Sequence, residues 1–102
     1  MVILTKKALR LAGEAHPRAQ EALRVWQTNV RLAQWATPTD VRTTMGYADQ
    51  IGDERFIFNI KGNHYRLLVA IRFRARTVYI KGFFTHSDYS KLTRDDLLTR
   101  EP

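Results

Sequence analysis

The sequence predicts an α+β fold in which two N-terminal helices pack on one face of an antiparallel β-sheet, in the order β-α-α-β-β-β. Residues 6–35 hold two apolar stripes at helical spacing, and residues 55–84 hold three runs with the alternation typical of strands. The chain has 102 residues, 44% of them hydrophobic, which is enough for one modest core. We therefore expect a single domain over residues 1–102.

The first third of the chain predicts a short strand over residues 2–5 and a helix from Lys6 to Ala15, with Thr5 as its N-cap. His16-Pro17 ends this helix, because a residue before proline disfavours helical dihedrals. Pro17 suits the first turn of a second helix, which is expected to run to about Trp35. Its apolar residues recur every three or four positions: Ala19, Leu23, Trp26, Val30 and Ala33.

The middle segment, residues 37–54, shows no sustained period and is punctuated by proline and glycine. It is predicted to be a long connection over the sheet edge, with room for one turn of helix. Strands are then expected over 55–61, 64–74 and 77–84, the first two joined by a tight turn at Gly62-Asn63. A short C-terminal helical turn should follow Thr85, and residues 93–102 are predicted to form a loosely ordered tail.

The positive charge is concentrated in one segment. The net charge is +7, and residues 55–81 hold seven basic and no acidic side chains, while the rest of the chain carries ten of each. Such a local positive field suits a polyanion such as nucleic acid, or an acidic protein. The alternative is a basic surface that serves only solubility.

Strand alternation divides the three predicted strands between two faces of the sheet. One face is apolar and should meet the helices, with Val78, Ile80 and Phe84 contributed by the third strand. The other face should carry a cationic, RNA-binding surface made of Asn59, Lys61, Arg66, Arg72, Lys81 and Thr85. Arginine can hold a phosphate with two parallel N–H donors, and nearby tyrosines could stack on unpaired bases. A solvated sheet face is the competing interpretation.

His86 follows the last predicted strand, and Tyr89 comes one helical turn later, so both side chains should point the same way. An imidazole beside a phosphate-binding surface is a candidate general acid or base. RNA supplies its own nucleophile, the 2′-hydroxyl, so cleavage would need only proton transfer and cations around the phosphate. A lone histidine is nevertheless more often a surface residue than a catalytic one.

Other chemistries have little support in the sequence. His16, His64 and His86 are widely spaced and have no acidic cluster beside them, so no metal is expected. There is no glycine-rich phosphate loop, and no cofactor is predicted. The chain has no cysteine and no apolar run near the roughly 20 residues that span a bilayer. We expect a cytoplasmic protein without a membrane partner.

The stretch FNIKGNHYRL at 58–67, followed by THSDY at 85–89, resembles the HigB-type toxins of bacterial type II toxin–antitoxin systems, within the RelE/ParE superfamily. The resemblance runs from about Met1 to Leu92 and implies a small RelE-like fold. It rests on N-x-x-G-N-x-x-R-L and T-H-x-x-Y at this separation. The positions that match the family's recurrent residues are Asn59, Gly62, Asn63, Arg66, Thr85, His86 and Tyr89.

The resemblance implies an endoribonuclease that cuts messenger RNA, typically mRNA being translated on the 70S ribosome. His86, Arg66, Tyr89 and Asn63 are then the expected catalytic residues, with the acid and base roles left open. It also implies a cognate HigA-type antitoxin with a helix-turn-helix domain, through which alone the toxin would meet operator DNA. Two alternatives stay open: a nucleic-acid-binding module without catalysis, and a gyrase-directed toxin of the ParE kind.

Overall fold

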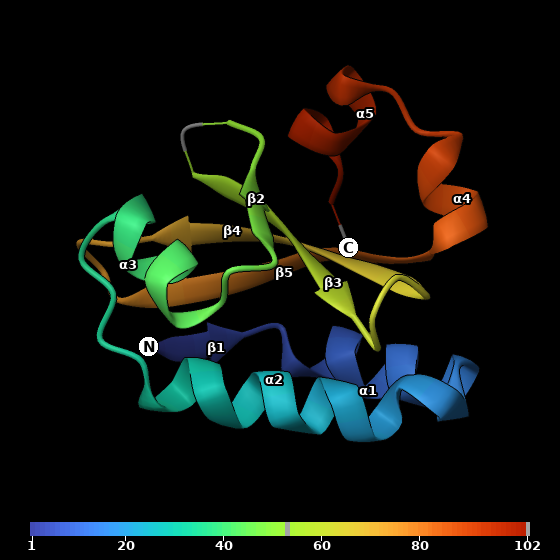
Figure 1. Ribbon diagram of the computed structural model, residues 1–102, viewed down its shortest axis with the longest axis horizontal. Coiled ribbons are helices and arrows are strands. Elements are labelled where there is room, and N and C mark those ends of the chain that lie inside the picture. The colour runs from blue at the N-terminus through green and yellow to red at the C-terminus, as the bar shows by residue number, and fades with distance from the viewer. Residues whose placement is uncertain (53, 102) are drawn as a thin grey trace.

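The chain folds into a five-stranded sheet flanked by helices, and the predicted α+β class is confirmed (Figure 1). The computed structural model describes residues 1–52 and 54–101; Asp53, in the predicted connection, and Pro102, in the predicted tail, lie outside the described residues. The strand order is β1-β5-β4-β3-β2, with β1 (Val2–Leu4) and β2 (Ala48–Gln50) at the edges. Because β1 runs parallel to β5 and the other pairs are antiparallel, the sheet is mixed, and the prediction of a purely antiparallel sheet is wrong.

The two N-terminal helices follow the prediction with one change of length. Helix α1 spans Lys6–Ala15, as expected, and a 3₁₀ turn at Pro17–Ala19 leads into α2, Gln20–Leu32. The second helix ends before the predicted Trp35, because Ala33 turns to extended dihedrals. The amino group of Met1 donates to the Ala33 carbonyl at 2.7 Å, which ties this helix end to the first strand. No helix among residues 1–52 and 54–101 is long and apolar enough to cross a membrane.

Thr5 precedes α1 as predicted, but its side chain does not cap the helix. Its φ is 65°, in the left-handed region, and it makes no side-chain cap hydrogen bond. Its Oγ1 instead accepts a hydrogen bond of 2.8 Å from the backbone N–H of Ile80 on β5. Thr5 therefore fastens the start of α1 to the sheet.

The middle segment holds more regular structure than the sequence predicts. Helix α3 spans Pro38–Thr44, and Thr37 and Asp40 close a reciprocal capping box at its start. The edge strand β2 follows and pairs antiparallel with β3. The predicted long connection is thus a short helix and a short strand, and the element order is β-α-α-α-β-β-β-β before the C-terminal helices.

The three central strands were located correctly. They are β3 (Arg55–Ile60), β4 (Tyr65–Arg72) and β5 (Thr77–Thr85), joined in sequence as antiparallel neighbours. The β3–β4 turn takes the four residues 61–64, in place of the predicted two-residue turn. Lys61 and Gly62 both have positive φ there, at 54° and 62°, a region that glycine adopts readily and lysine does not.

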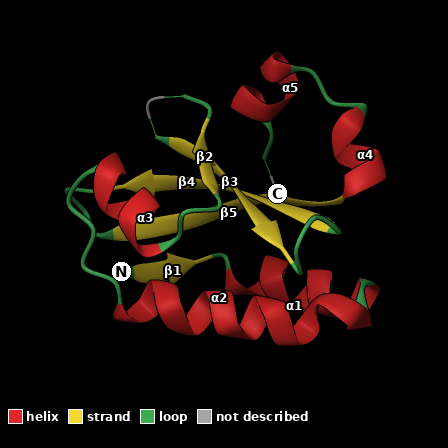
Figure 2. Cartoon of the chain, viewed as in Figure 1, coloured by secondary structure: helices red, strands yellow, loops and turns green. Residues whose placement is uncertain are grey.

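The main core lies between the sheet and the helices α1, α2 and α3. Figure 2 shows α1 and α2 beside one another along one side of the strands. Trp26 packs edge-on against Phe58, with ring centroids 5.5 Å apart, and Trp35 stacks on the same ring. Large side chains of this kind carry most of the burial of a small domain, at roughly 1.5–3 kcal/mol for each fully buried one. The rigid sheet that results positions everything on its other face.

A β-bulge in β5 changes which way the end of that strand faces. Leu68 pairs with Gly82, but the next residue, Val69, pairs with Ile80, so Lys81 is an extra residue. Beyond the bulge the alternation is reversed. Phe84 joins the cluster on the second face, so the prediction that it belongs to the helix-covered face is wrong.

The C-terminal segment packs on the second face of the sheet, away from α1 and α2 (Figure 2). Helix α4 spans His86–Ser90, where the short helical turn was predicted, and α5 spans Arg94–Thr99. Leu97 of α5 is buried against a small apolar cluster of Ile57, Leu68 and Phe84. In place of the loose tail expected after Leu92, the structure therefore has a packed helix over the centre of the second face.

Candidate active site

The β3–β4 turn and the start of α4 meet at one end of the sheet. Tyr65, the first residue of β4, pairs with Thr85, the last residue of β5. The backbone N–H of His86 then donates to the carbonyl of His64 at 2.9 Å, which joins the two segments. The Thr85 hydroxyl accepts from the N–H of Asp88 at 3.1 Å and so starts α4 at His86. The imidazole is thereby placed next to the turn.

Arg66 links these two segments with its side chain. It lies on the second face of β4, and its guanidinium donates to the Asn63 carbonyl at 3.1 Å and to Asn63 Oδ1 at 3.2 Å. The same Nη2 lies 3.4 Å from His86 Nδ1, and the guanidinium carbon lies 5.4 Å from the centre of the Tyr89 ring. We call Arg66, Asn63, His86 and Tyr89 the Arg66 cluster. The structure brings together all four residues that the sequence singled out as catalytic candidates.

The contact between Arg66 and His86 constrains the imidazole. A guanidinium has donors and no acceptor, so Nδ1 of His86 must accept in this contact, and the proton of the neutral ring is then on Nε2. His86 and Asn63 are exposed, whereas Arg66 and Tyr89 are half-buried. The cluster thus offers an anchored cation and an accessible imidazole to a ligand at the surface.

The predicted RNA-binding residues do not form one continuous surface. Asn59 pairs with Arg66 across the sheet, and Lys61 is exposed in the adjoining turn, so both lie near the Arg66 cluster. Thr85 pairs with Tyr65, whose ring stacks on Phe83 on the helix-covered face. Thr85 is on this face because the bulge shifts the alternation of side chains by one residue. The expectation that Thr85 faces the second side of the sheet is therefore wrong.

Arg72 lies at the far end of the same strand. It is six residues from Arg66, about 20 Å along a strand, and it forms an ion pair of 3.3 Å with Glu54. Lys81 lies between the two, at the bulge, and its ammonium contacts Glu101 at 2.7 Å. The single cationic surface that the sequence predicts is thus divided, because the C-terminal segment lies across its middle.

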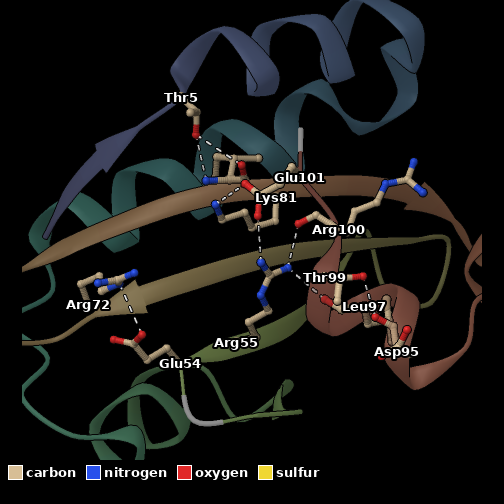
Figure 3. A network of polar contacts seen from close by, with 11 residues as sticks. Thr5, Glu54, Arg55, Arg72, Lys81, Asp95, Leu97, Thr99, Arg100 and Glu101 are labelled. Carbon is tan, nitrogen blue, oxygen red and sulfur yellow. Dashed lines mark hydrogen bonds and ion pairs between the residues drawn. The ribbon is translucent and has the colours of Figure 1, made fainter.

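Two residues that the sequence reasoning did not select occupy this middle region. Arg55, whose side chain is only 15% exposed, forms an ion pair of 3.1 Å with Glu101. The hydrogen bond from Lys81, supported by Arg55, holds the pKa of the Glu101 carboxyl below its usual range. Figure 3 shows the carboxylate between the two cations. Across residues 1–52 and 54–101, no three His, Cys, Asp or Glu side chains are grouped as metal ligands.

The chain matches a known protein family and named relatives over most of its length. Residues 19–92 match the family model HigB_toxin, described as the RelE-like toxic component of a toxin–antitoxin system. The chain is 25% identical over 95 residues to the mRNA interferase toxin HigB of Escherichia coli K12, an alignment that covers 91% of each protein. It is 24% identical over 96 residues to the mRNA interferase HigB of Escherichia coli O6:H1, covering 92% of this chain and 93% of the relative.

The match spans the turn, β4, β5 and α4, and therefore every residue of the Arg66 cluster. The family expected from the two short motifs is confirmed. The chain belongs to the HigB_toxin family, the RelE-like toxic components of toxin–antitoxin systems.

Proposed function

We propose that this chain is an mRNA interferase, an endoribonuclease that acts as the toxin of a type II toxin–antitoxin system with a RelE-like fold. The observation that carries the proposal is the Arg66 guanidinium, held between Asn63 and His86 and lying over Tyr89. The names of the relatives, mRNA interferases from two Escherichia coli strains, support the same activity.

The proposed reaction uses the nucleophile within RNA. The 2′-oxygen attacks the adjacent phosphorus, its proton passes to a base, and the bond to the 5′-oxygen breaks as that oxygen gains a proton. The products are a 2′,3′-cyclic phosphate and a free 5′-hydroxyl. His86 and Tyr89 are the members of the cluster that can exchange a proton, because a guanidinium stays protonated. Arg66 would stabilise the charge on the non-bridging oxygens, and Asn63 would orient Arg66.

The proposal includes independence from metal ions and action on translated mRNA in the ribosome. An internal nucleophile and a fixed arginine supply the activation and the charge stabilisation that metal ions provide in many nucleases. Asn59 and Lys61 lie beside the cluster and would contact the RNA on either side of the scissile phosphate. Cleavage that persists in excess chelator, on ribosomes washed into buffer with polyamines, would support the metal-independent part.

The proposed partner is a cognate antitoxin of the HigA type with a helix-turn-helix domain, which would carry the complex to operator DNA. Membership of a toxin–antitoxin family supports this pairing. The site of action would be the cytoplasm, where ribosomes and mRNA are found. Co-expression with the neighbouring reading frame should restore growth and yield a complex that survives gel filtration.

The decisive experiment is controlled expression in bacteria with mapping of message ends by primer extension. Wild type should arrest growth and shorten translated messages, and His86→Gln should do neither while remaining folded by circular dichroism. His64→Gln is the matched control, because that histidine is exposed in the neighbouring turn and outside the Arg66 cluster. Full toxicity of His86→Gln would remove the proposed active site. Growth arrest with intact messages and inhibited gyrase would point to the ParE-like alternative.

A further inference from the structure

The C-terminal segment places a carboxylate between two cations of the sheet. Arg55 Nη2 donates to Glu101 Oε2 at 3.1 Å, and Lys81 Nζ donates to Glu101 Oε1 at 2.7 Å, so each oxygen has its own cation (Figure 3). The two cationic side chains are largely covered, at 15% and 18% exposure, whereas that of Glu101 is 62% exposed. The cations belong to the rigid sheet and the anion to a surface segment.

Another cation and an aromatic ring lie beside this pair. The same groove, about 570 Å³ in volume, is also lined by Tyr79 and by Arg72, which is itself paired with Glu54 in the groove. Lys81 lies 5.7 Å from the centre of the Tyr79 ring, which provides an aromatic face beside the ammonium. Proteins bind the phosphates of single-stranded nucleic acid with arginine and lysine, and they stack its bases on aromatic rings.

A carboxylate and a phosphate are recognised by the same donors. Both present two oxygens to an arginine fork or to an arginine and a lysine together. We propose that Arg55 and Lys81 form a second phosphate site for the RNA strand, and that Glu101 occupies it in the free protein until RNA displaces it. This inference rests on the proposed function, since it assigns a second contact to the same substrate.

The position of the site suits a second contact with one strand. Arg55 lies four residues before Asn59, which pairs with Arg66, so the two sites are about 13 Å apart along the sheet. That distance corresponds to roughly four nucleotides of a stacked strand at about 3.4 Å each. An RNA held at both places would have its phosphate at the Arg66 cluster fixed in position by the distant contact.

Glu101 can leave the site without unfolding the sheet. It follows the end of α5, and Arg55 keeps bonds of 3.0 and 2.8 Å to the carbonyl oxygens of Leu97 and Arg100. Ion pairs that involve an exposed partner are individually weak in water. An RNA strand that is also bound at the Arg66 cluster could therefore displace the Glu101 carboxylate from Arg55 and Lys81 with one of its phosphates.

The test compares Glu101→Gln with Glu14→Gln. The second variant changes the net charge by the same amount but on α1, where Glu14 pairs with the exposed Arg10. The probe is a fluorescent 12-nucleotide RNA with 2′-O-methyl groups throughout, which cannot be cleaved, and binding is followed by anisotropy at several salt concentrations. Glu101→Gln should bind about three- to tenfold more tightly than Glu14→Gln, as expected when one or two ion pairs no longer compete. Its plot of log K against log salt should be steeper by about 0.7, the increment for one more phosphate contact.

A double variant separates the site from a general charge effect. In a Lys81→Gln background the gain from Glu101→Gln should shrink to less than half, because the two residues act on the same site. Equal affinities of Glu101→Gln and Glu14→Gln, an undiminished gain in the double variant, or no binding by any protein would each overturn the proposal. Circular dichroism should show the same helix content in all of them.

The outcome is independent of the cleavage experiment. A chain that binds this RNA more tightly as Glu101→Gln but cuts no message would keep the second site and lose the nuclease. A chain that cuts messages while Glu101→Gln matches its control would keep the nuclease and lose the second site.

Discussion

Replacing Arg66 by lysine keeps the positive charge but removes the planar fork at the centre of the candidate active site. In the wild type, one guanidinium contacts the Asn63 carbonyl, Asn63 Oδ1 and His86 Nδ1 while lying over Tyr89. A lysine ammonium is a single point charge on a flexible stem and cannot span these partners together. The variant therefore tests whether the shape of the cation matters, separately from its charge.

The expected effect lies in the chemical step. Lysine cannot hold its charge in the single orientation that Asn63 and His86 give to the guanidinium, and losing one such preorganised group raises a barrier by about 2–4 kcal/mol. The rate should then fall by about 30- to 1,000-fold. Affinity for RNA should change by less than about threefold, because the long-range attraction to phosphate depends on charge, which is unchanged.

The assay is single-turnover cleavage of mRNA bound to purified ribosomes, measured at saturating protein so that affinity does not enter the rate. Arg74→Lys is the matched control, because Arg74 is exposed in the β4–β5 turn, away from the Arg66 cluster. A single-turnover rate of Arg66→Lys within about threefold of wild type would refute the reasoning, as would a defect that disappears at saturation.

Three further predictions concern the C-terminal segment. Leu97→Ala should lower the free energy of unfolding by about 2–3 kcal/mol in urea titrations, because Leu97 is 7% exposed and packs on Ile57, Leu68 and Phe84; an unchanged midpoint would mean that α5 does not stabilise the sheet. Asp96→Ala should cost about 1 kcal/mol and speed amide exchange in α5, since Asp96 closes the capping box with Thr93; unchanged exchange would contradict this. The pKa of Glu101 is lowered, chiefly by Lys81, so its contact stabilises the fold above the unfolded value of about 4.3 and is lost as pH falls through the folded value. The difference in Tm between wild type and Glu101→Gln should accordingly be present at pH 6 and shrink below about pH 4; a difference that does not vary with pH would exclude the ion pair as its source.

Local patterns were sufficient to predict the two N-terminal helices, the short helix α4 and the three central strands. Helix α1 has the predicted bounds because its apolar stripe and the following proline are both local signals. The end of α2 was missed because it depends on a distant contact: Met1 bonds to the carbonyls of Arg31 and Ala33. The pairing of β1 beside β5, which makes the sheet mixed, likewise depends on the whole fold rather than on any one segment.

The faces of β5 could not be derived by counting alternate residues. One extra residue at Lys81 reverses the alternation of side chains in the rest of β5, so Phe84 and Thr85 lie on the faces opposite to those predicted. The sequence held one available signal, because glycine inside a strand often marks a bulge, and Gly82 adjoins this one. A Cβ at that position would lie 2.6 Å from the Phe84 ring, so the ring needs the space that glycine leaves.

The C-terminal helix was missed because its composition looks like that of a tail. Thr93 and Asp96 have the spacing of a capping box, and two leucines follow directly. Read together, these residues predict a short helix with an apolar side. Such a helix needs an apolar surface to rest on, and the second face supplies one through Ile57 and Leu68. The expectation of a cationic second face that meets a ligand concealed this.

The Arg66 cluster could be assembled from sequence while the wider RNA-binding surface could not, and the reason is geometric. Its residues come from two short segments, 63–66 and 86–89, at the same end of the β4–β5 pair. One ladder pair, Tyr65 with Thr85, and one bond, from His86 N–H to the His64 carbonyl, fix these segments against each other. A surface that extends from Arg66 to Arg72 also depends on the structure between these two residues. That region contains the bulge in β5 and is covered by α5. Residues near one end of a hairpin are therefore the ones whose proximity a sequence can predict.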